Sequence, residues 1–229
     1  MKYFFLILVI SNLAISESAK RTEGNFFGGY CSMSATGHAT HPGIVTLSDL
    51  GTLTKEGKLC AALDLTIKGR YRISANYLPA YYSDTASPIS SRLYANSYEL
   101  GLALNFGKPD KWNFFIGGTG RLFQLKVEDY TESGTIISTA GFDYKFLIPT
   151  IHSGLELKIG KRFAILGEVK LYSWKGNSLN DFSGTLKFRL IKALSVALGY
   201  RALKFNYTTD SLQTEVSLAG PFFMAGLNF

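Results

Sequence analysis

The stretch from Cys60 to Tyr82, in which residues alternate in polarity from Ala61 to Tyr77, constrains the fold more than any other part of the sequence. From Ala61 onward every second residue is apolar, small or aromatic, and most of the residues between them are polar or charged. A period of two places these sets on opposite faces of an extended strand. Strands in soluble proteins usually have about five or six residues, whereas the walls of transmembrane β-barrels combine an apolar outer face with a polar lumen. The stretch therefore predicts one long wall strand, 59–82.

The same alternation continues to the end of the chain. The predicted strands are 59–82, 93–106, 112–130, 142–159, 162–175, 179–190, 194–207 and 213–229. The period shifts at Pro149, where we expect a β-bulge. Short turns and longer polar loops at 83–92 and 130–141 match the two ends of an outer-membrane barrel. We therefore predict an all-β, closed antiparallel transmembrane barrel over 59–229, with eight strands and with ten as the alternative.

The first 58 residues differ from the rest. Lys2 precedes an apolar run, and small residues follow it at Ser16 and Ser18, so 1–18 is predicted to be a secretory signal peptide. The run is shorter than the roughly 20 residues that a spanning helix needs. Residues 19–58 are assigned to an N-terminal periplasmic or lumen segment, which could plug the lumen, lie under the barrel or add a hairpin to the wall.

Charge and cysteine content limit the partners and cofactors. The formal net charge is +7, but lysine and arginine are spread singly along the strands, so no nucleic-acid partner is expected. Export makes a disulfide between Cys31 and Cys60 possible, and two free thiols are the alternative. His38 and His41 could share a metal, but a stable site needs three or four ligands and no third is near. We expect no metal and no cofactor.

The polar faces of the predicted strands would meet in the lumen. Basic residues outnumber acidic ones there, so the set supports two interpretations: an ion-paired filling of the lumen, or a narrow channel that prefers anions. The lumen charge cluster is predicted to contain Asp64, Lys68, Arg70, Arg72, Glu99, Arg121, Glu156, Lys158, Glu168, Lys170, Asp181, Lys187, Arg189 and Arg201.

No catalytic site is predicted. Lipid A deacylases built on barrels use a histidine and a serine two residues apart on one strand face, whereas His152 and Ser153 are adjacent and would point to opposite faces. We expect a structural or surface-interaction role, exercised through the loops 83–92 and 130–141. Two further hypotheses are a lipid-modifying barrel enzyme and a soluble periplasmic β-barrel or sandwich.

The C-terminal residues carry a more specific pattern. Phe223, Ala225, Leu227 and Phe229 occupy every second position up to the last residue. This resembles the C-terminal signature of Gram-negative outer-membrane barrels, which the barrel assembly machinery recognises. The stretches 198–205, 220–222, 226–229 and 48–51 resemble a broad group of small, uncharacterised outer-membrane β-barrel proteins. The resemblance implies an outer-membrane location in the cell envelope, with membrane lipid and the assembly machinery as partners, and leaves the surface ligand unidentified. Pro221, inside the last strand, departs from the pattern and is assigned to a bulge or a strand end.

Overall fold

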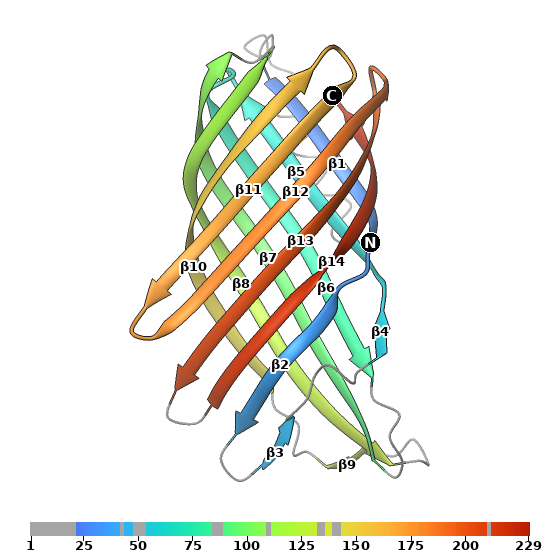
Figure 1. Ribbon diagram of the computed structural model, residues 1–229, viewed down its shortest axis with the longest axis vertical. Helices are drawn as coiled ribbons and strands as arrows, with labels where there is room; N and C mark the ends of the chain where they lie inside the picture. The colour runs from blue at the N-terminus through green and yellow to red at the C-terminus, as the bar shows by residue number, and fades with distance from the viewer. Residues whose placement is uncertain are drawn as a thin grey trace.

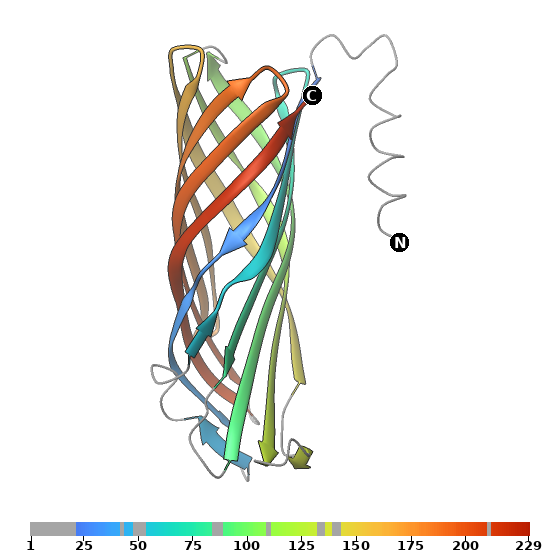
Figure 2. The same ribbon diagram turned by 90° about the vertical axis from the view of Figure 1, so that its right-hand side faces the viewer.

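The computed structural model describes residues 22–41, 44–47, 54–83, 89–108, 111–131, 136–138, 143–209 and 212–229. These residues form a tall barrel of tilted antiparallel strands (Figures 1 and 2). Within them, no helix is long and apolar enough to cross a membrane. The predicted signal peptide lies outside the described residues.

Ten strands close the wall in the described part of the chain, so the prediction of eight strands is wrong and the alternative of ten is confirmed. Successive strands pair in chain order, and the first pairs with the last. The wall strands are β1 (Thr22–Cys31), β5 (Lys58–Ile67), β6 (Tyr71–Ser83), β7 (Ile89–Lys108), β8 (Trp112–Thr131), β10 (Asp143–Ile159), β11 (Phe163–Trp174), β12 (Asn177–Ile191), β13 (Leu194–Thr209) and β14 (Leu212–Asn228).

Four short strands extend the wall at the end opposite the C-terminus (Figure 1). They are β2 (Ser34–His41), β3 (Ile44–Leu47), β4 (Thr54–Glu56) and β9 (Ile136–Ser138). The C-terminus and the short turns at 160–162 and 192–193 lie at the other end, which is the periplasmic end in outer-membrane barrels. We call these the outer and periplasmic ends.

The first of the two strands beyond the predicted eight arises because one predicted strand is a hairpin. The predicted strand 59–82 is in fact β5 and β6, joined by a turn at 68–70 with Lys68 and Gly69 at positive φ. Because this connection has three residues, Ile67 pairs with Tyr71 and odd-numbered residues stay on the outer face of both strands. A period of two therefore runs through the turn unchanged.

That hairpin also corrects two lumen assignments. Lys68 and Arg70 were predicted to face the lumen, but they belong to the turn and are exposed at the periplasmic end. The Arg70 N–H donates to the Ile67 carbonyl at 3.1 Å, which closes the turn.

The second additional strand is the N-terminal one. Residues 22–41 lie along β14 in one unshifted register, from Cys31 opposite Phe222 to Ala35 opposite Leu218, so β1 and β2 form one wall strand. Of the placements left open for 19–58, residues 22–41 therefore match an addition to the wall, and they neither plug the lumen nor lie under the barrel. The strand is interrupted opposite Pro221. The Ser32 N–H donates to the Pro221 carbonyl at 3.0 Å, but proline has no N–H that could donate in return. Pro221 neither ends β14 nor shifts its register on β13.

The wall is strongly sheared. Following directly opposite residues from strand to strand once around the barrel measures this shear. The path starts on β10 at Ile159 and returns to β10 at Leu147, twelve residues away. Between them it passes through Phe163, Phe188, Val196, Ala225, Gly28, Ala61, Tyr77, Tyr98 and Leu122. Such a shear requires strands tilted by about 35–45°, and ten strands enclose a wider lumen than eight. More side-chain volume is then needed to fill it.

The polarity of the two faces inverts along the strands. In β10, Leu155 is exposed on the outer face near the periplasmic end, whereas Phe146 and Ile148 are buried on the inner face near the outer end. The β8–β10 register is continuous past Pro149, so the bulge expected there is wrong. The apparent shift of period arises because the apolar residues change faces while the backbone does not.

Other strands show the same inversion. On β8, Ile116 faces outward and Phe123 is buried inside; on β13, Leu198 faces outward and Phe205 is buried inside. The periplasmic part of the barrel thus has the pattern of a membrane protein. The outer part has the apolar interior and polar exterior of a water-soluble barrel.

A disulfide ties the N-terminal strand to its neighbour. Cys31 on β1 and Cys60 on β5 are bonded on the inner face, with 6.0 Å between their Cα atoms. Pairing of β1 with β5 ends at Cys31 and Lys58, and beyond it β2 pairs with β3. The disulfide therefore lies where the two wall strands separate.

Removal of this bond tests its contribution to stability. We expect the Cys31→Ser/Cys60→Ser variant to lose up to about 3–4 kcal/mol of unfolding free energy, because the 29-residue separation would no longer be constrained in the unfolded chain. Urea unfolding in lipid vesicles measures the change. Reductant should lower the wild-type midpoint and leave the variant unaffected; equal midpoints for both proteins would contradict the prediction.

Candidate functional site

The centre of the lumen holds a network of buried ions from five strands, which we call the central ion cluster: Glu99, Arg121, Lys170, Asp181 and Arg201. Arg121 is fully buried on β8. Its Nε and Nη2 donate to Glu99 Oε2 at 3.1 and 2.5 Å, and Nη2 also donates to Asp181. One guanidinium thus joins carboxylates that come from β7 and β12.

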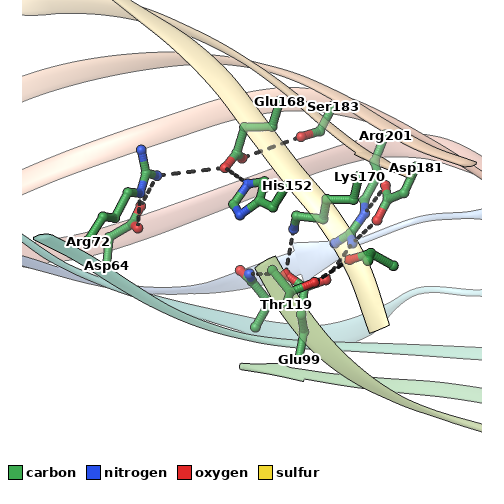
Figure 3. Close-up of polar contacts among 12 residues, drawn as sticks. Asp64, Arg72, Glu99, Thr119, His152, Glu168, Lys170, Asp181, Ser183 and Arg201 are labelled. Atoms are coloured by element: carbon green, nitrogen blue, oxygen red, sulfur yellow. Dashed lines mark hydrogen bonds and ion pairs between the residues drawn. The ribbon is translucent and has the colours of Figure 1, made fainter. Parts of the chain in front are cut away.

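Two further bases complete the central ion cluster. Figure 3 shows Lys170 and Arg201 pointing toward the same carboxylates. Lys170 Nζ donates to Glu99 Oε1 at 2.5 Å, and Arg201 binds Asp181 through Nε at 2.8 Å and Nη2 at 2.5 Å. Buried ions are tolerated only when they are paired and hydrogen-bonded, and each carboxylate here has at least two basic partners.

A second ionic group lies beside the first. Arg72 makes two bonds to Asp64, at 2.8 and 2.7 Å, and its Nη2 lies 3.6 Å from Glu168 Oε1. The same Glu168 oxygen lies 3.2 Å from His152 Nε2. The Phe115 ring packs under both, with the Arg72 guanidinium carbon 3.9 Å from its centroid and the imidazole edge-on at 5.0 Å.

These two groups are balanced in formal charge when His152 is neutral. Four bases face four acids: Arg72, Arg121, Lys170 and Arg201 against Asp64, Glu99, Glu168 and Asp181. The excess of basic residues expected for the lumen is therefore not found where the side chains are most buried.

The remaining predicted lumen residues lie nearer the periplasmic end. Lys187 Nζ is 3.6 Å from Glu156 Oε1, with both side chains partly exposed. Lys158 is half-buried and Arg189 is exposed. Arg189 therefore does not belong to a buried cluster, because β12 ends two residues later.

An apolar cluster fills the lumen on the outer side of the ions. Its rings pack closely: the Phe123 and Phe205 centroids are 4.9 Å apart, and those of Phe146 and Tyr207 are 4.4 Å apart. We call it the outer apolar cluster: Tyr82, Phe123, Leu125, Phe146, Leu179, Leu203, Phe205, Val216 and Leu218. Sequence reasoning missed it, although the change of period at Pro149 was its signal.

A small cavity remains between the ions and the disulfide. It has a volume of about 80 Å³ and is lined by Glu168, Lys170 and Arg201 on one side and by Cys31, Cys60 and Met33 on the other. This space suits a few ordered water molecules.

His152 and Ser153 do not form a catalytic pair, because they lie on opposite faces of β10. The His152 side chain is buried in the lumen, while Ser153 follows on the outward-facing side of the strand. Among the described residues, no three His, Cys, Asp or Glu side chains are grouped to hold a metal. His38 and His41 are on β2, and their side chains lie outside the described part of the structure.

The residues of the predicted assembly signal lie on the outer face of β14. Phe223 and Leu227 are exposed there, and the C-terminal Phe229 is exposed at the periplasmic end. Ala225 occupies the same face, since it pairs with the outward-facing Val196 and Gly28.

Comparison with solved structures identifies the fold. The outer-membrane protease OmpT of Escherichia coli superimposes with a TM-score of 0.61 at 9% identity, covering 92% of this chain and 98% of OmpT. The chain has the fold of an outer-membrane β-barrel. Two other outer-membrane barrels also match. The attachment invasion locus protein Ail of Yersinia pestis has a TM-score of 0.43 at 8% identity, covering 91% of this chain and 99% of Ail. Neisserial surface protein A has a TM-score of 0.35 at 13% identity, covering 91% of this chain and 96% of that protein. No protein-family model and no curated protein sequence matches the chain.

Arg121 is the residue whose loss should affect this barrel most. We expect Arg121→Met to lower the unfolding free energy by about 3–5 kcal/mol, because two buried carboxylates lose a shared partner. The matched control is Lys204→Met, which removes an exposed pair with Glu215 at 2.8 Å and should cost at most about 1 kcal/mol. Guanidinium unfolding in vesicles measures both, and equal effects would contradict the assignment of Arg121 as the central partner.

Proposed function

We propose that this protein is a non-conducting outer-membrane barrel with a structural or surface-interaction role. The observation that carries the proposal is the filling of the lumen by two successive layers. The central ion cluster occupies the middle, and the outer apolar cluster occupies the space beyond it. Hydrated ions would have to displace fully buried side chains such as Arg121 and Phe123 to pass.

The outer end of the barrel suits interaction in water. On its outer face Gln124 donates to Asp143 at 2.9 Å and Lys204 pairs with Glu215, so polar side chains replace the apolar band. The proposed interaction segments, 83–92 and 130–141, are reached by β7 and β8, the longest strands of the described wall. Parts of both segments lie outside the described residues.

A channel and an enzyme have less support. An anion-leaning channel requires excess positive charge at the constriction, but the four buried bases and four buried acids balance when His152 is neutral. A lipid-modifying enzyme requires a base and a nucleophile on one face, but His152 and Ser153 point to opposite faces. The likeness to OmpT, a protease, is a likeness of fold at 9% identity and transfers no activity.

Two measurements on the folded mature protein test the proposal. In a planar bilayer we expect no steady conductance, and a stable anion-selective current would overturn the closed lumen. On intact cells, a membrane-impermeant maleimide should label Lys145→Cys, which is exposed on the outer part of β10, and not Leu157→Cys within the apolar band of the same strand. Labelling of neither variant would contradict display above the membrane.

Assembly is proposed to depend on the C-terminal residues. The alternating, outward-facing side chains of β14 support recognition by the barrel assembly machinery. We expect deletion of Phe229 to reduce the heat-modifiable, folded form in outer membranes severalfold. Removal of Lys192 from a periplasmic turn is the control. Unchanged assembly after loss of Phe229 would refute this role.

A further inference from the structure

The periplasmic end of the barrel, which holds the C-terminus in Figure 1, is strongly basic. Nine lysine and arginine residues are described there, two or three in each of the segments 68–70, 108–111, 158–162 and 189–192. Lys158 is half-buried and the other eight are exposed. Against them the sequence has Glu23, Asp110 and the C-terminal carboxylate at this end, because Glu156 is already paired with Lys187 farther inside.

The rest of the molecule has no such excess. The buried ions of the lumen balance when His152 is neutral. The sequence around the outer end has nine acids and seven bases, in the segments 38–58, 83–92, 126–145, 175 and 204–215. The formal net charge of +7 therefore comes mainly from the periplasmic end.

Four of the nine bases face one another in two like-charge pairs. The Lys158 N–H donates to the Lys111 carbonyl at 2.8 Å, and the Arg189 N–H donates to the Arg162 carbonyl at 2.8 Å. Each bond extends a strand ladder by one pair, the first between β8 and β10 and the second between β11 and β12. Like charges directly opposite each other destabilise a sheet, and within the described residues no carboxylate pairs with any of the four.

The two like-charge pairs lie on the lumen side of the wall. Lys158 shares its face of β10 with the buried His152, and Arg189 shares its face of β12 with the buried Asp181. Their partners across the ladders share that face, as directly opposite residues do. Membrane lipid contacts the other face, so an anion that neutralises these pairs must come from the periplasm.

We propose that the periplasmic end binds the carboxylate-bearing peptides of the cell wall. The nine bases lie at the turns of eight strands, from β5 to β13, and neighbouring strands are about 4.8 Å apart. A small anion reaches only adjacent turns, whereas an extended polymer with repeated carboxylates can neutralise bases around the whole rim. Arginine binds carboxylates with two parallel hydrogen bonds. This surface is independent of the closed lumen and of the loops at the outer end, so the inference goes beyond the proposed function.

Sedimentation with isolated cell-wall sacculi tests the proposal. The folded mature protein in detergent is mixed with sacculi, and the bound fraction is measured against protein concentration. The test variant is Lys111→Gln/Lys158→Gln/Arg162→Gln/Arg189→Gln. The matched control, Lys126→Gln/Lys145→Gln/Lys175→Gln/Lys204→Gln, removes the same charge from the outer end. We expect half-saturation about tenfold higher in the test variant and unchanged in the control, because exposed ion pairs are individually weak but four are lost together.

The chemistry of the partner is tested on the sacculi themselves. Coupling their carboxylates to glycinamide removes the negative charge, and wild-type protein should then lose most of its binding. Full binding to the amidated sacculi would overturn the proposal. So would unchanged binding of the test variant, or an equal loss in the control. Loss of phosphatidylglycerol in native mass spectrometry without loss of sacculus binding would assign the bases to the membrane instead.

Folding of each variant is verified by a heat-dependent gel shift. The urea midpoint of the test variant should stay the same or rise, because two repulsive pairs are removed. A lower midpoint would contradict the repulsion that motivates the site. If the fourfold variant does not fold, Lys111→Gln/Lys158→Gln alone must still weaken binding to sacculi.

Discussion

The pairing of β1 with β14 is the constraint on which the rest of the structure depends. In hydrocarbon every backbone N–H and C=O must find a partner, so a sheet can cross a membrane only when it closes. The N-terminal residues therefore belong in the wall, and the ten-residue β1 completes it. The disulfide between Cys31 and Cys60 holds this strand to β5 at the point where their pairing ends.

Closure with ten strands creates an interior that must be filled. The middle is filled with ions, which are tolerated there because Arg121, Lys170 and Arg201 share the carboxylates of Glu99 and Asp181. Toward the outer end the wall leaves the lipid, so its exterior becomes polar and its interior apolar. The alternating residues of the same strands thus build a membrane barrel at the periplasmic end and a water-soluble barrel at the outer end.

Glycines on the inner face of the wall make room for the side chains that pack in the lumen. A Cβ added to Gly154 would lie 2.4 Å from the Phe115 ring, and one added to Gly199 would lie 2.2 Å from the Phe222 ring. These positions therefore follow from packing inside the barrel.

Alternation along the chain was enough to predict the barrel class, the bounds of the last seven wall strands to within a few residues, and the inward direction of Arg121, Glu99 and Asp181. It is a local property, and it reports which face each residue occupies. The strand number required the tertiary structure, because the three-residue turn at 68–70 leaves the alternation unchanged. The pairing of the ions required it as well, because Glu99, Lys170 and Asp181 come from strands whose neighbours are set by closure and shear.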